Sequence, residues 1–178
     1  MLKFGLYVVF ILTASLAAAR ADDERPPEIK AYLNSQKPYG KGTYSFLFDD
    51  LYEATLWTDA STWSWQTPFA LTLRYDIHVT SKRLIEKSIE EMNEESALSK
   101  AEMELYTNTL LPIFPDIKPG DQITALYTPR KALRFFYNGK PMGIIKDTAL
   151  AKRFIGIWLS ERTSAPDLRD QLLFVHNT

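Results

Sequence analysis

The stretch "PFALTLRYDIH", residues 68–78, decides the fold class of this chain. Apolar side chains stand at every second position from Phe69 to Ile77, and small or polar side chains stand between them. Strict alternation over this length predicts a β-strand with one face in a hydrophobic core. The other face, which carries Arg74, is expected to be polar.

Similar alternation elsewhere predicts a sheet around this strand. We expect further strands at 44–48, 51–57, 123–127, 133–137 and 142–145. Asn138-Gly139 is a strong hairpin signal between the last two strands.

Trp63 and Trp65 lie in the loop over 58–68, and their spacing in an extended segment points both rings to one side. They are expected either to close one end of the sheet or to line the mouth of a cleft.

The helical segments begin at capping residues that are followed by apolar residues at spacings of three and four. We expect these caps at Thr80, Ser99, Asp147 and Ser164. Glu102 completes a capping box with Ser99, and Pro166 suits an early helical position after Ser164. Together, the segments predict an α+β fold in which a large antiparallel sheet carries a layer of helices on one face.

The first 21 residues are typical of an export signal. Lys3 supplies a positive start, residues 4–19 are mostly apolar, and Ala19-Arg20-Ala21 fits the cleavage pattern of small residues. The alternative is a membrane anchor, but the charged residues directly after Ala21 favour cleavage there. We therefore expect a periplasmic or secreted protein with a flexible leader over 22–39, a single domain over 40–176, and no integral membrane segment once the signal is removed.

The composition excludes several classes of function. The chain has no cysteine, so disulfides, thiol catalysis and thiolate metal sites are absent. Without Lys3 and Arg20 the chain carries 19 basic and 22 acidic residues, a net charge of −3. That charge argues against nucleic acid as a partner, because a nucleic-acid interface needs a clustered basic surface.

Six motifs in order resemble the chalcone isomerase-like family, in particular its exported bacterial branch. They are "YEATLW" (52–57), "PFALTLRY" (68–75), "RLIEKSIEEM" (83–92), "FPDIKPGD" (114–121), "FFYNGKPMGII" (135–145) and "FIGIWLSERTSAPDL" (154–168). The resemblance implies the same α+β fold, with a ligand cleft between the sheet and the helices.

The resemblance also implies where catalytic groups would stand. Plant members that cyclise chalcones use an Arg, a Thr, a Tyr, an Asn and a second Thr to hold the substrate oxygens and a water. The corresponding positions here are Tyr39, Leu51, Leu84, Glu91 and Ile157. None of the five residues is kept, and each lost donor to a developing oxyanion costs about 3 kcal/mol. We therefore expect no catalytic residue.

The candidate ligand-contacting residues combine those apolar replacements with nearby polar side chains. They are Lys41, Tyr44, Leu51, Arg74, Leu84, Glu91 and Ile157. Arg74 is included because a cation on that strand face could meet a ligand carboxylate if helices cover the face.

Three functions are compatible with these residues. The preferred hypothesis is a non-catalytic protein that binds a small apolar ligand, fatty-acid-like or flavonoid-like, in the cleft. The alternative is an intramolecular lyase or isomerase with Lys41, Tyr44 or Glu91 as polar groups, and a further alternative is a protein-interaction module anchored by Trp63 and Trp65. The volume of the cleft should discriminate, because a filled cleft has no room for a ligand or a substrate.

No metal or other cofactor is expected. The two histidines, His78 and His176, make a poor metal pair because the second stands in the C-terminal tail. The adjacent Asp49 and Asp50 would point to opposite faces of a strand. Ser164 lacks the Gly-x-Ser-x-Gly setting of a hydrolase nucleophile, so capping is the expected role.

Overall fold

The computed structural model describes residues 24–47 and 49–174. One antiparallel sheet holds all the strands in chain order: β1 (Gly40–Phe46), β2 (Asp49–Thr58), β3 (Phe69–Tyr75), β4 (Gln122–Thr128), β5 (Ala132–Tyr137) and β6 (Lys140–Ile145). The helices are α1 (Ser81–Glu95), α2 (Lys100–Leu110), α3 (Thr148–Leu159) and α4 (Pro166–Leu173), with a short 3-10 helix η2 at Pro27–Ile29. The predicted α+β class is confirmed.

Alternation along the strands gives the sheet two different faces. On β3, Leu71 and Leu73 point into the core beneath the helices, as do their partners Ala125 and Ile123 on β4. The residues between them point to the opposite face, called here the second face. Thr72 and Thr124 are paired there, with their hydroxyl oxygens 3.5 Å apart.

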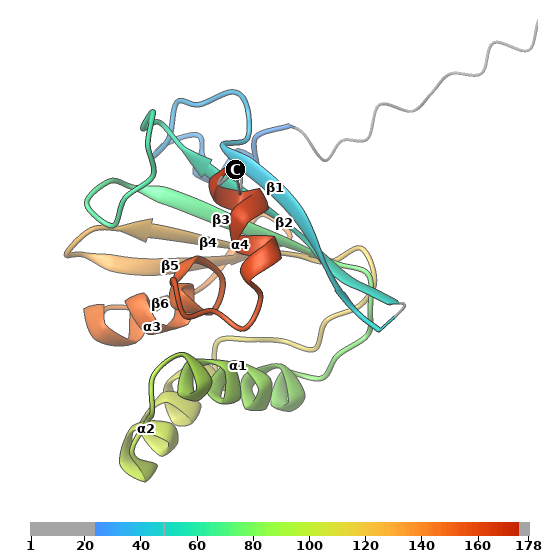
Figure 1. Ribbon diagram of the computed structural model, residues 1–178, viewed down its shortest axis with the longest axis vertical. Helices are drawn as coiled ribbons and strands as arrows, with labels where there is room; N and C mark the ends of the chain where they lie inside the picture. The colour runs from blue at the N-terminus through green and yellow to red at the C-terminus, as the bar shows by residue number, and fades with distance from the viewer. Residues whose placement is uncertain (1–23, 48, 175–178) are drawn as a thin grey trace, which may run out of the picture.

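The helices lie on the first face of the sheet (Figure 1). α3 is the central one, because eight of its residues are buried and its apolar residues join the core. α1 packs on α3 and α2 packs on α1, and the two helices form an outer layer at one end of the molecule (Figure 1). α4 packs along β1, where Gly40 lets the two backbones approach: a Cβ there would stand 2.0 Å from the carbonyl oxygen of Leu172.

Three of the predicted caps are confirmed. The Asp147 carboxylate accepts from the backbone N–H of Ala149 and Leu150, and the Thr80 hydroxyl accepts from the N–H of Arg83. Ser99 and Glu102 form the complete capping box. These helix starts depend on contacts over two or three residues, which is why the sequence alone was sufficient.

The fourth predicted cap is wrong. α4 begins after Ala165, which makes no side-chain capping bond, and the Ser164 hydroxyl donates instead to the Glu91 carboxylate on α1. A charged acceptor from a distant helix has replaced the local backbone contact that the sequence predicted.

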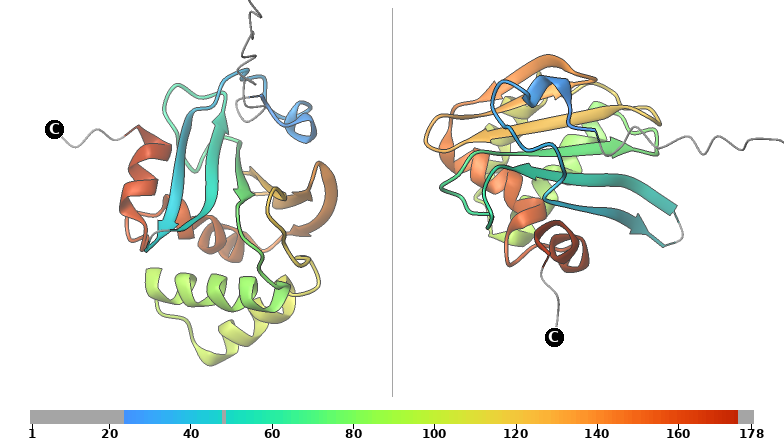
Figure 2. Two further views of the ribbon diagram at one scale, coloured as in Figure 1. Left: turned by 90° about the vertical axis from the view of Figure 1, so that its right-hand side faces the viewer. Right: turned by 90° about the horizontal axis from the view of Figure 1, so that it is seen from above.

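The predicted flexible leader is corrected for its described residues, 24–39. Ile29 is fully buried and Leu33 nearly so, and both pack on Trp57 in a small core on the second face. Glu28 accepts from the Thr124 hydroxyl at 2.6 Å, and Arg25 donates to the Leu33 carbonyl at 2.6 Å. Figure 2 shows this segment on the side of the sheet away from α1 and α2. The apolar residues bind the segment to the sheet in spite of Pro26-Pro27.

The two loop tryptophans close one end of the sheet. Trp63 and Trp65 contact each other edge to face at 5.2 Å, and both rings pack against Phe69. Trp65 also contacts Tyr127 at 5.6 Å. Both residues are half-buried, so this arrangement does not present them as the exposed anchors that a protein-interaction module would use.

Candidate functional site

The space between the sheet and the helices, called here the sheet–helix cleft, is nearly filled. Its remaining cavity measures about 30 Å³ and is walled by apolar side chains of β3, β4, α1 and α3, together with Phe114. That volume holds at most about two or three water molecules, since one requires roughly 10–15 Å³ by this measure. A fatty acid or a chalcone does not fit the cleft in this conformation.

Aromatic rings occupy most of this space. Phe114, from the segment after α2, contacts Phe135 at 4.9 Å and Phe154 at 5.6 Å between ring centroids. Phe154 also packs on Trp158, one turn further along α3. These rings join the sheet, α3 and the α2–β4 connector into one core.

The structure divides the candidate residues between the two faces. Tyr44, Leu84, Glu91 and Ile157 lie on the helix side of the sheet or on the helices. Lys41 and Arg74 lie on the second face, as their cross-strand partners Thr55 and Glu53 show. Leu51 stands at the bulge beside the inward-facing Tyr52 and is not among the residues packed against the core under the helices. The sequence treated the seven as one group, and the structure brings only four of them near the cleft.

Leu51 is corrected, because the inward position belongs to its neighbour. Tyr52 pairs with Tyr44 on β1 and with Tyr75 on β3, and the three rings follow one another beneath the helices. The Tyr44–Tyr52 rings are stacked at 5.3 Å and the Tyr52–Tyr75 rings are tilted at 5.7 Å. A shift of one residue reverses the face in a strand, and the alternation of Tyr52, Ala54 and Leu56 was the signal that could have shown it.

A polar contact links this tyrosine row to α3. The indole Nε1–H of Trp158 donates to the Tyr52 hydroxyl at 3.0 Å. Burial raises the pKa of Tyr52 and of Tyr75 well above the ordinary tyrosine value. Both phenols are therefore neutral at physiological pH and cannot act as bases there.

Glu91 is engaged rather than poised for catalysis. Its carboxylate lies 2.8 Å from the ammonium of Lys87 on the same helix, and it accepts from the Ser164 hydroxyl. One turn further along α1, Glu95 accepts from Ser160 at 2.8 Å and lies 3.5 Å from Arg162. These contacts fasten the C-terminal half of α1 to the segment between α3 and α4.

Leu84 and Ile157 are apolar contacts of the core. Leu84 is half-buried and forms part of the cavity wall, and Ile157 on α3 is 8% exposed. Neither side chain can donate to a developing oxyanion, so the positions that the resemblance assigns to a Tyr and a Thr supply no polar group.

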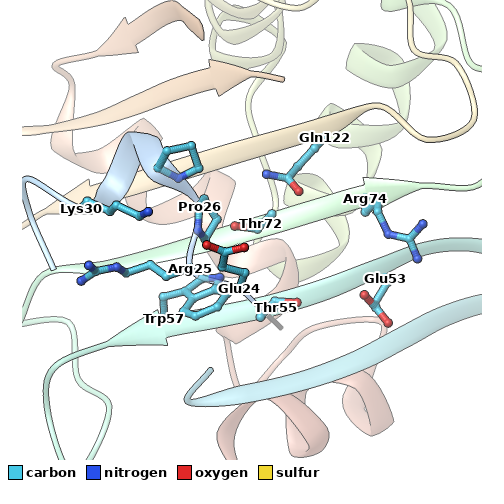
Figure 3. A pocket seen from close by; sticks show the side chains of 11 residues that line it. Glu24, Arg25, Pro26, Lys30, Glu53, Thr55, Trp57, Thr72, Arg74 and Gln122 are labelled. Carbon is cyan, nitrogen blue, oxygen red and sulfur yellow. The ribbon is translucent and has the colours of Figure 1, made fainter. Parts of the chain in front are cut away.

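The second face has a larger hollow, called here the second-face groove. It measures about 330 Å³ and lies between residues 24–30 and strands β2, β3 and β4 (Figure 3). Arg74 is part of its lining, and the N-terminal segment, rather than a layer of helices, covers this face. The Arg74 guanidinium lies 4.0 Å from Asp76, and Lys41, at the edge of the groove, lies 3.1 Å from Glu53.

Within residues 24–47 and 49–174, no group of three or more His, Asp or Glu side chains is placed to hold a metal ion. In the same part of the chain, no helix has the length and hydrophobicity to cross a bilayer. His176 and the predicted export signal lie outside the described residues.

The fold and the cleft define a class of protein: an antiparallel sheet under a helical layer, with the space between them lined by apolar side chains. The chain belongs to the chalcone isomerase-like family, whose model matches residues 33–174. The family resemblance seen in the six motifs is thereby confirmed. No curated protein sequence matches the chain significantly.

Among solved structures, the chain is similar to a fatty-acid binding protein of Arabidopsis thaliana. The TM-score is 0.59 over 77% of this chain and 86% of that chain, at 12% sequence identity. At this identity the likeness shows a shared fold.

Replacing Tyr52 by Phe should remove the acceptor for Trp158 Nε1–H. Leaving that donor unsatisfied should lower the free energy of unfolding by about 1–3 kcal/mol at pH 7. Because the pKa of Tyr52 is raised in the folded state, the unfolded chain loses this proton first above about pH 10, and Tyr52 then destabilises the fold. Above about pH 10, the difference in free energy of unfolding between the native protein and Tyr52→Phe should therefore shrink by up to about 1.4 kcal/mol per pH unit.

Urea denaturation at pH 7 and pH 11 measures both effects. Tyr32→Phe is the control, since Tyr32 is 46% exposed and its replacement should leave the free energy of unfolding at pH 7 nearly unchanged. A deficit of equal size at the two pH values would contradict the assignment.

Proposed function

We propose that the chain is an exported, non-catalytic chalcone isomerase-like protein that binds a small apolar ligand in the sheet–helix cleft when α1 and α2 move outward. The observation that carries the proposal is the lining of the cleft. Leu71, Leu73 and Ile123 of the sheet face Leu84 of α1 and Phe154 of α3 around the remaining cavity. An apolar molecule would replace these contacts without leaving buried polar groups unpaired.

The movement is needed because ligand sites usually measure roughly 300–1,000 Å³. The construction of the fold favours α1 and α2 as the moving part. α1 packs on α3, α2 packs on α1, and the connectors at 76–80 and 111–121 attach the pair to the sheet. Outward movement of α1 would also break the bonds that Glu91 and Glu95 accept from Ser164 and Ser160. The connectors are joined to each other by the backbone pair Val79–Ile117, so the helices can move as one piece.

A fatty-acid-like or flavonoid-like molecule is the proposed ligand class. The apolar residues at Leu84 and Ile157 support it, since they stand where the plant enzymes would hold oxygen atoms. The similarity to the Arabidopsis protein supports the same class, because that neighbour is a fatty-acid binding protein. Glu91 supports the non-catalytic part, because its ion pair with Lys87 and its bond from Ser164 occupy the carboxylate.

Palmitate should bind the purified mature protein with micromolar affinity and 1:1 stoichiometry in native mass spectrometry. Leu84→Trp should weaken binding by at least about tenfold, because the larger ring fills the space at the cavity wall. Leu105→Trp is the matched control, since Leu105 is 56% exposed on α2 and should leave the affinity unchanged.

Absence of palmitate binding, or equal affinity of the two variants, would contradict the proposed site. Thermal melting of both variants shows that they fold.

The absorbance of an added chalcone should stay constant with the same protein. A decay that Glu91→Gln abolishes would contradict the non-catalytic part and favour the isomerase alternative.

Export is proposed from the sequence of residues 1–21. Expressed in a bacterium with its full sequence, the protein should be released with the periplasmic fraction and begin at Asp22. Intact mass measurement and N-terminal sequencing of the released protein check this. Replacing Ala19 and Ala21 with Arg should retain the uncleaved chain, whereas Ala17→Val should not. Retention of Met1 in the released native protein would contradict the proposal.

A further inference from the structure

We propose that the second-face groove is a binding site for a small organic anion that has a flat apolar part. The site is independent of the proposed function, because the sheet separates it from the sheet–helix cleft. Its volume of about 330 Å³ compares with about 30 Å³ in the cleft. Small-molecule sites usually begin at roughly 300 Å³, so the groove can hold such a ligand in the conformation observed.

The charge of the lining favours an anion. Arg25 and Lys30 lie toward one end of the groove and Arg74 lies toward the other (Figure 3). Two carboxylates, Glu24 and Glu53, share the lining, but Glu53 is already paired with Lys41 at 3.1 Å. Three cations and two acids thus line the groove, and Arg74 itself lies 4.0 Å from Asp76. Guanidinium groups form their strongest hydrogen bonds with carboxylates and similar anions.

A buried donor at the groove supplies a second and separate observation. Trp57 is 1% exposed, and its indole Nε1–H finds no acceptor among the described residues. The same holds for Nε of Arg25, which also lines the groove. Since about nine in ten buried polar groups are hydrogen-bonded, two such donors at one cavity point to an acceptor that lies outside the described residues. The rings of Pro26 and Pro27, which also line the groove, offer contacts to a flat apolar group of the ligand.

Glu24 shows how an acid fits the groove. Its carboxylate points into the middle of the hollow, near Thr72, Arg25 and Trp57 (Figure 3). Because Glu24 belongs to the N-terminal segment and is exposed, it can leave this position at little cost. A ligand carboxylate would take the same place, and Glu24 would compete with it.

Titration of the mature protein with cinnamate tests the site, with cinnamyl alcohol as the uncharged analogue. Cinnamate should bind with a Kd of about 1 mM or lower, and the alcohol should bind at least about tenfold more weakly. The NMR signal of the Trp57 indole N–H, assigned with Trp57→Phe, should shift on binding. The indole N–H signal of Trp158, which belongs to α3 on the other side of the sheet, should not shift.

Three variants complete the test. Arg74→Gln should weaken cinnamate binding about tenfold, and Lys152→Gln, an exposed change on α3, should leave it unchanged. Glu24→Gln should strengthen binding severalfold, and because Glu24 is exposed the fold should persist. The proposal would be overturned if cinnamate does not bind at about 10 mM, or if cinnamyl alcohol binds equally well. It would also be overturned if Glu24→Gln binds cinnamate more weakly, or if the indole N–H signal of Trp158 shifts and that of Trp57 does not.

Failure of this site leaves palmitate binding in the cleft unaffected, and failure of the cleft leaves this site unaffected. The two proposals use different ligands, different variants and different measurements, so each can be contradicted separately.

Discussion

The packing of aromatic rings between the sheet and α3 is the contact on which the rest of the structure depends. Phe135 on β5, Phe154 on α3 and Phe114 after α2 form a closed triangle of ring contacts of 4.9–5.6 Å. With no cysteine in the sequence, such contacts are what hold the helical layer in place. They also fill most of the sheet–helix cleft.

The two faces of the sheet consequently have different properties. The helix side is apolar and nearly closed, which is why the binding proposed there involves movement of α1 and α2. The second face keeps an open hollow because the N-terminal segment covers it only in part, through Ile29 and Leu33. One scaffold thus separates a closed apolar space from an open, positively charged one, and each is suited to a different class of small molecule.

The features that the sequence predicted correctly depend on short-range patterns. The alternation in 69–77 and the cap at Asp147 act over a few residues; the cap is present, and the strand forms as β3 but ends at Tyr75, two residues before Ile77. The errors concern contacts between distant segments. Ser164 bonds to Glu91 instead of capping its own helix, Tyr52 rather than Leu51 faces the helices, and the leader packs on the sheet. The second-face groove could not be predicted from the sequence. It forms only because the N-terminal segment packs on the sheet and so lies opposite strands β2, β3 and β4.

Hydrogen exchange of backbone amides tests most directly the central claim that the cleft is closed by packing and opens by movement of α1 and α2. The account predicts that amides of these two helices exchange through an opening of lower free energy than amides of β3 and β4. Saturating palmitate should then change protection in α1 and α2 before it changes protection in the sheet. Exchange of α1, α2 and the sheet at one common free energy, that of global unfolding, would contradict the account.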